Sequence, residues 1–152
     1  MFPFDRLIKA IDVLAGEKAI AEPIFAQIGS GTYLPKHFPF VDFMSRSDFK
    51  DTIQNSKYIV SHAGTGTISA AIKNSKPILI VPRQRKHNEH VDDHQLETAR
   101  FYTSLGSAIM ATNEVDIAKQ LTILYDFKPR PRVTNPIPLV LDIKLFLEKF
   151  VK

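Results

Sequence analysis

Residues 61–67, Ser61-His62-Ala63-Gly64-Thr65-Gly66-Thr67, follow a short apolar run, Tyr58-Ile59-Val60, and precede a segment of helical character at residues 68–74. A strand that ends in small residues and opens into a helix leaves several backbone N–H groups without partners. These groups and the positive end of the helix dipole suit an anion, most often a phosphate. The glycines at 64 and 66 let a ligand approach the backbone, because no Cβ stands in the way. The stretch lacks the lysine of a P-loop and the three-glycine spacing of a dinucleotide fingerprint. By itself it therefore indicates either an anion-binding turn or an ordinary tight strand–helix turn.

Length and composition indicate one globular domain. The chain has 152 residues, of which 44% are apolar and 24% are charged, as is usual for globular proteins. It contains no run of about 20 apolar residues that would span a membrane, and its first residues do not have the pattern of a signal sequence. It also has no cysteine, which excludes disulfides and thiolate chemistry and favours a cytoplasmic location.

The charge points to an anionic partner. The net charge is +4 and the pI is near 9.3, which favours a nucleotide, a nucleic acid or an anionic membrane surface. The basic residues are spread along the chain and are not interleaved with aromatic residues. This distribution argues against nucleic acid as the partner.

Apolar runs typical of strands alternate with segments typical of helices, which predicts a parallel sheet covered on both faces. Ligands of such sheets bind beyond the carboxyl ends of the strands, so residues 61–67 and 83–95 should meet at one edge. Residues 1–127 would form this Rossmann-like domain, and residues 128–152 a proline-rich connector and an amphipathic helix at 139–151. The expected strands are residues 24–28, 40–44, 58–61, 77–81 and 107–111, and the expected helices are residues 4–15, 48–55 (capped by Ser47), 68–74, 91–104 and 114–125 (capped by Asn113).

The densest polar stretch is Arg83-Gln84-Arg85-Lys86-His87-Asn88-Glu89-His90-Val91-Asp92-Asp93-His94-Gln95. Three interpretations are open from its chemistry. His90 and His94 are spaced to share one helix face, as metal ligands do. The acids and amides also suit the start of a helix that needs no ligand. Finally, their mixed donors and acceptors suit a polyhydroxylated ligand such as a sugar.

Four stretches together resemble the C-terminal domain of family 28 glycosyltransferases, in its short stand-alone form. They are Phe4-Asp5-Arg6-Leu7-Ile8, residues 61–66, Pro82-Arg83 and, most specifically, Glu89-His90-Val91-Asp92-Asp93-His94-Gln95. The resemblance covers nearly the whole chain. Within the family the chain is similar to bacterial subunits that add β-1,4-linked sugars in capsule and exopolysaccharide assembly. It is also similar to the catalytic subunit of the eukaryotic dolichyl-diphosphate N-acetylglucosaminyltransferase.

The resemblance implies the nucleotide-sugar-binding, C-terminal half of a GT-B fold. The backbone of residues 64–67 would receive the donor diphosphate, with His62 beside it and Arg83 offsetting phosphate charge. No metal or other cofactor is implied, because amide donors and the helix dipole can stabilise the leaving diphosphate. The substrate-binding residues implied by the resemblance are His62, Gly64, Thr65, Gly66, Thr67, Arg83, Glu89, His90, Asp93 and Gln95.

The implied reaction is an inverting transfer of a sugar from a UDP-sugar to a lipid-diphosphate-linked acceptor. A membrane-anchored partner subunit would bind the acceptor and supply the general base, with His62 as the candidate base in this chain. The protein would then be cytoplasmic and peripheral at the inner face of the plasma membrane, and a homo-oligomer is an open option. The alternative is a non-catalytic nucleotide-binding subunit that regulates a partner transferase.

The chain departs from the family in two places. Family members usually open with a strand and a Gly-Thr turn, whereas this sequence goes directly into Pro3-Phe4-Asp5. Either the start is truncated or the sheet closes in another way, and loss of a central strand would expose two sheet edges. Many relatives also carry a ribose-binding glutamate where this chain has Ser69-Ala70-Ala71, which we interpret as a mark of the subgroup.

Overall fold

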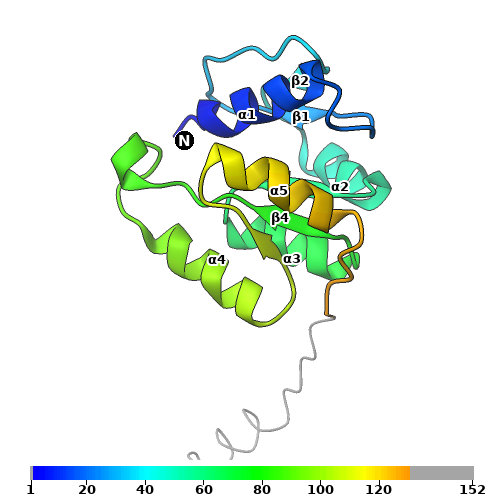
Figure 1. Ribbon diagram of the computed structural model, residues 1–152, viewed down its shortest axis with the longest axis vertical. Coiled ribbons are helices and arrows are strands. Elements are labelled where there is room, and N and C mark those ends of the chain that lie inside the picture. The colour runs from blue at the N-terminus through cyan, green and yellow to red at the C-terminus, as the bar shows by residue number, and fades with distance from the viewer. Residues whose placement is uncertain (1, 131–152) are drawn as a thin grey trace, which may run out of the picture.

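The computed structural model describes residues 2–130 and consists of helices alternating with short strands (Figure 1). Residues 131–152, which include most of the expected connector and the helix at 139–151, lie outside the described residues. No helix in the described part has the length and apolar character needed to cross a bilayer. The elements are α1 (Asp5–Gly16), β1 (Ala26–Gln27), β2 (Phe40–Val41), α2 (Arg46–Asn55), β3 (Ile59–Ser61), α3 (Thr65–Lys73), β4 (Ile78–Ile80), the 3-10 helix η1 (Arg85–His87), α4 (His94–Ser104), β5 (Ile109–Met110) and α5 (Glu114–Leu124).

Local capping explains where the helices begin. Asn113 caps α5 as predicted, since its side chain accepts a hydrogen bond from the Asp116 N–H. The predicted cap Ser47 is wrong: Ser45 accepts the bond from the Asp48 N–H, and α2 begins at Arg46, two residues earlier than predicted. The helix expected from residue 91 begins only at His94, because the Asp93 carboxylate accepts a bond from the Arg85 N–H and holds the preceding loop in bends.

All strand pairs are parallel, as predicted, but they form two sheets instead of one. Strand β1 pairs with β2, and β4 pairs with β3 on one side and β5 on the other. The described residues show no ladder between β1 and β3. Helices nevertheless pack on both faces of the three-stranded sheet, and in Figure 1 α5 lies in front of β4 while α3 lies behind it.

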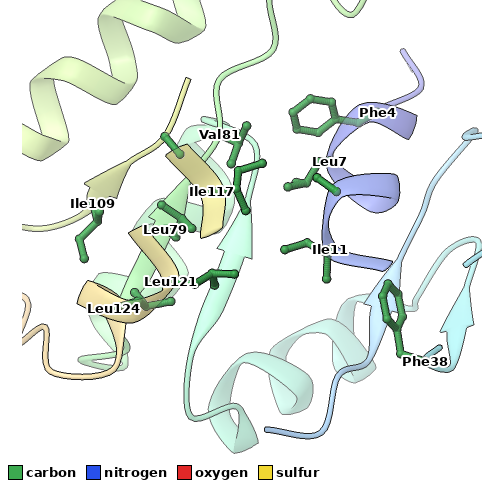
Figure 2. Close-up of a cluster of buried hydrophobic side chains, with 12 residues drawn as sticks. Phe4, Leu7, Ile11, Phe38, Leu79, Val81, Ile109, Ile117, Leu121 and Leu124 are labelled. Atoms are coloured by element: carbon green, nitrogen blue, oxygen red, sulfur yellow. The ribbon is translucent and has the colours of Figure 1, made fainter. Parts of the chain in front are cut away.

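Two apolar clusters cover the two faces of the three-stranded sheet. Because side chains alternate along β4, this strand contributes residues to both clusters. Leu79 points into the cluster with α1 and α5, whereas Ile78 and Ile80 point into the cluster with α2, α3 and α4. Figure 2 shows α1 presenting Leu7 and Ile11 toward the side chains of α5. This packing joins the α1–β1–β2 part to the three-stranded sheet, so that the carboxyl ends of β3 and β4 lie beside the start of α1.

Candidate functional site

The amino end of α3 offers free main-chain donors at the carboxyl end of β3. Gly64 is the N-cap, and its carbonyl accepts from the Ile68 N–H at 3.2 Å. The N–H groups of Thr65, Gly66 and Thr67 precede the first intrahelical bond and point out of the helix end. Thr65 and Gly66 are exposed. The four residues predicted for the diphosphate thus form one helix terminus with its donors directed outward.

The two glycines of this turn, Gly64 and Gly66, lie in different surroundings. A Cβ added to Gly64 would meet the imidazole ring of His62, so the ring covers that position. A Cβ added to Gly66 would have no atom within 4 Å. The space over Gly66 is therefore open for a ligand, whereas the space over Gly64 is occupied by the protein itself.

His62 follows β3 and is partly buried beside this turn. Burial is the main cause that lowers its pKa, to about 4, and the positive charge of Arg83 acts in the same direction. A contact with the Gln95 side chain opposes the shift. The buried Nδ1 has no hydrogen-bond partner among the described residues. At neutral pH the imidazole is uncharged and can accept a proton.

Two arginines bring unused donors to the same edge. Arg83, after β4, stacks its guanidinium over the Phe4 ring at 5.2 Å, and its buried Nε has no partner within the described part of the chain. The same holds for Nη1 of Arg6. Burial lowers the pKa of Arg83, which Glu89 partly offsets. Buried donors without acceptors are costly in a folded protein, so both arginines suit an anionic ligand.

Gln95 connects the ends of two strands. Its Oε1 accepts from the Ala63 N–H at 3.2 Å and from the Arg83 N–H at 3.1 Å, and the residue is 4% exposed. These bonds fix the turn after β3 against the turn after β4. The predicted contact of Gln95 with a sugar stays a prediction, and its side-chain oxygen is already engaged.

Glu89 is likewise held inside the protein. Its two carboxylate oxygens receive bonds from Arg6 Nε at 2.7 Å and Nη2 at 2.9 Å, and Oε2 also accepts from the Gln84 N–H. Arg6 donates further to the carbonyl of Pro82 at 3.2 Å. The pair therefore fastens the loop after β4 to α1. In the sequence Arg6 stands within the family stretch Phe4-Asp5-Arg6-Leu7-Ile8, and no local pattern relates it to a residue 83 positions away.

The loop before α4 gathers a second polar group. His90 Nδ1 lies 3.2 Å from an Asp92 carboxylate oxygen, and His94 Nδ1 bonds to the same oxygen. The ligand atoms of the three side chains lie within 4.8 Å of one another, so these residues could hold a metal ion. The expected helix face shared by His90 and His94 is wrong, because α4 begins at His94 and a bend brings the rings together. The absence of a metal requirement stays a prediction.

Sequence comparison assigns the chain to a known family. Residues 3–135 match the model of the glycosyltransferase family 28 C-terminal domain. A bacterial relative from Prochlorococcus marinus (strain MIT 9515) is 30% identical over 91% of this chain and 36% of its own length; it is named UDP-N-acetylglucosamine--N-acetylmuramyl-(pentapeptide) pyrophosphoryl-undecaprenol N-acetylglucosamine transferase. The human UDP-N-acetylglucosamine transferase subunit ALG13 is 30% identical over 60% of this chain and 8% of its own length. The chain thus spans little more than a third of the first relative and less than a tenth of the second.

A solved structure supports the same architecture. Spinosyn forosaminyltransferase SpnP superposes with a TM-score of 0.56 at 20% identity, over 80% of this chain and 31% of that protein. At this identity the likeness concerns the fold. It agrees with the Rossmann-like parallel fold of a GT-B glycosyltransferase half that the sequence predicted.

Proposed function

The chain belongs to the glycosyltransferase family 28 C-terminal domains, and from that premise we propose that it binds the UDP-sugar donor of an inverting glycosyltransferase. The diphosphate would lie against the first turn of α3, over Gly66, with Arg83 at its side. The sugar would face the loop of residues 89–95. The names of the bacterial and human relatives, both UDP-N-acetylglucosamine transferases or subunits, support UDP as the nucleotide.

One observation carries this proposal. Free main-chain N–H groups at the start of α3 and unpartnered buried donors on Arg83 and Arg6 gather at one edge of the sheet. Positive charge and fixed amide donors in a partly buried place are what a leaving diphosphate needs. In the described part of the chain, no carboxylate accepts from Arg83 Nε or Arg6 Nη1.

In the proposed reaction an acceptor hydroxyl attacks the anomeric carbon of the donor. Its oxygen forms the new glycosidic bond, the bond from the anomeric carbon to UDP breaks, and the electron pair of that bond leaves with UDP. A general base takes the hydroxyl proton. The neutral imidazole of His62 is the candidate base in this chain, although its low pKa makes it a weak one, and a base on a partner subunit remains the principal proposal.

The acceptor side belongs to a second polypeptide in this proposal. The human relative is named a transferase subunit, and the bacterial relative acts on a pyrophosphoryl-undecaprenol compound by its name. We infer a lipid-diphosphate-linked sugar as acceptor, a membrane-anchored partner that holds it, and a position at the inner face of the plasma membrane. Capsule or exopolysaccharide assembly is the proposed context.

A non-catalytic nucleotide-binding subunit is the second candidate. The engagement of both Glu89 oxygens and of the Gln95 oxygen within the protein favours it, because fewer groups are left to orient a sugar. Such a subunit would bind UDP and UDP-sugar equally well.

Calorimetric titration separates these functions. We expect UDP to bind more tightly than uridine, because the diphosphate supplies the charge, and to bind unchanged in EDTA. UDP-N-acetylglucosamine binding that exceeds UDP binding, and that loses this excess in Gln95→Ala, supports the transferase. Equal affinity for both supports the regulatory subunit. No UDP binding, or binding only when zinc is added, would contradict both.

A further inference from the structure

The bend that leads into α4 brings three metal-ligating side chains to one point. His90 Nδ1 lies 3.2 Å from a carboxylate oxygen of Asp92, and His94 Nδ1 bonds to the same oxygen. The two imidazole rings meet edge to face, with their centroids 4.6 Å apart. One ligand atom from each of the three residues lies within 4.8 Å of the other two. We call these three residues the histidine cluster.

The separations within the histidine cluster fit a tetrahedral metal ion. Zinc binds imidazole nitrogen and carboxylate oxygen at about 2.0–2.2 Å, so two ligand atoms of one tetrahedral site stand about 3.3 Å apart. The distance of 3.2 Å between His90 Nδ1 and the Asp92 oxygen agrees with this value. The side chain of His94 is 54% exposed, so its ring is free to turn and complete the set.

The residues that alternate with the histidine cluster anchor the same loop to the protein. Both oxygens of Glu89 accept from Arg6, and the Asp93 carboxylate accepts from the Arg85 N–H at 2.8 Å. Gln95 bonds to the turns after β3 and β4. The three ligands therefore project from a main chain that is already fixed, and an ion has little ordering cost to overcome.

The histidine cluster also stands where α4 begins without a side-chain cap. Asp93 is the N-cap residue, but its side chain makes no capping bond to the helix. An ion held between His94 in the first turn and His90 and Asp92 in the bend fixes the start of the helix in its place. The carboxylates of Asp92 and Asp93 offset the repulsion between a cation and the positive end of the helix dipole. With Asp92 58% exposed, the ion enters from solvent.

We propose that His90, Asp92 and His94 bind a divalent transition-metal ion of the zinc type. Two imidazoles and one carboxylate select zinc, cobalt or nickel over magnesium and calcium, which prefer oxygen ligands. Three protein ligands leave the fourth tetrahedral position to water. The ion ties the bend to α4 and is not needed at the proposed diphosphate site, whose main-chain donors lie at the start of α3. The metal site thus goes beyond the proposed function and does not rest on it.

Calorimetric titration of zinc into the metal-free chain, without nucleotide, tests the site. We expect one ion per chain. His90→Ala and His94→Ala should each weaken zinc binding by about 100-fold or more, because loss of a ligand exceeds the 10–100-fold effect of losing an outer-shell partner. The matched control is His87→Ala, an exposed histidine of the same loop, which should leave the zinc affinity unchanged. Magnesium should not compete with zinc.

Two further measurements report on the geometry and on the folding of the variants. Cobalt(II) bound to the wild type should show the intense visible absorption of tetrahedral coordination, which both variants should lack. Zinc should raise the urea midpoint of the wild type but not that of His94→Ala, because an ion that binds only the folded chain stabilises it. In EDTA the variants should unfold close to the wild-type midpoint, which shows that they are folded.

Three outcomes decide against the metal site. Absence of zinc binding by the folded wild type would overturn it. Equal zinc affinity in the wild type and in both variants would place the ion elsewhere on the chain. Magnesium binding as tight as zinc binding would indicate an adventitious ion only, held at an acidic surface. Because UDP binding is measured separately in EDTA, failure of the metal site and failure of the proposed donor site are distinguishable.

Discussion

At the scale of single residues, Gly64 and Gly66 differ in what an added Cβ would meet. Gly66→Ala adds a methyl group to open space in the first turn of α3, so we expect unchanged or slightly increased stability, by about 0.5–1 kcal/mol. UDP affinity should fall by roughly tenfold or more, because the methyl group lies where the diphosphate approaches the backbone. Urea unfolding and calorimetry with UDP measure the two effects.

Gly64→Ala is the matched comparison. Its methyl group displaces the His62 ring, so we expect a loss of about 1–3 kcal/mol in unfolding free energy, the usual cost of overpacking. Retention of full UDP affinity in Gly66→Ala would contradict a diphosphate at this helix end.

His62 should make the stability depend on pH. Its pKa is lowered to about 4 in the folded protein, against about 6.5 in an unfolded chain. Between these values the unfolded state binds more protons, so the free energy of unfolding falls as the pH falls from 6.5 to 4, by up to about 3 kcal/mol. The pKa values of the Asp12 and Asp92 carboxylates are lowered from the usual value of 3.8. Their effects on stability therefore fall below pH 3.8, outside the range from pH 4 to 6.5.

Urea unfolding at several pH values between 7 and 4 measures this effect. His62→Gln should flatten the curve, whereas His87→Gln, at an exposed position, should leave it unchanged. An identical slope in the wild type and in His62→Gln would show that His62 is not the group responsible.

At the scale of elements, the pair formed by Arg6 and Glu89 joins α1 to the loop after β4. Glu89→Gln removes the negative charge opposite a largely buried arginine, with side-chain exposures of 11% for Arg6 and 6% for Glu89. We expect a loss of about 2–4 kcal/mol in unfolding free energy, because the remaining charge is uncompensated. The substitution should also weaken UDP binding, since the loop carries Arg83.

Urea unfolding of Glu89→Gln, Arg6→Gln and the double variant gives the coupling energy of the pair. The control is Glu97→Gln, at an exposed position of α4, which should change stability by no more than about 0.5 kcal/mol. Additive losses in the double variant would contradict a direct role of the pair.

At the scale of the whole molecule, the described residues form two sheets without a ladder between β1 and β3. Side-chain packing of α1 on α5 holds them together, and such packing opens more easily than a continuous ladder. We therefore expect the Ala26 and Ile28 amides to exchange through openings about 2 kcal/mol or more lower in free energy than those of Leu79 and Ile80.

Native-state hydrogen exchange in low guanidinium measures these opening energies. Equal values for both sheets would mean that the molecule opens as one unit. Leu7→Ala, which removes part of the contact between α1 and α5, should lower the Ala26 and Ile28 values more than those of Leu79.

Patterns along the chain were enough to determine much of this protein. The alternation of apolar runs and helical segments predicted the parallel Rossmann-like fold, and Asn113 with Asp116 three residues later marked the start of α5. The turn at Gly64 to Thr67 indicated an anion site, and the spacing of the motifs indicated the family. Such features depend on neighbours in sequence, because side-chain periodicity and capping are local.

Only the tertiary structure decided which polar side-chain groups already have hydrogen-bond partners within the described residues and which do not. It engaged Glu89 with Arg6 and the Gln95 oxygen with two turns, gathered His90, Asp92 and His94 through a bend, and left donors on Arg83 and Arg6 unpartnered among the described residues. These are contacts between segments far apart in sequence, and their partners are chosen by packing in three dimensions, which no local pattern encodes.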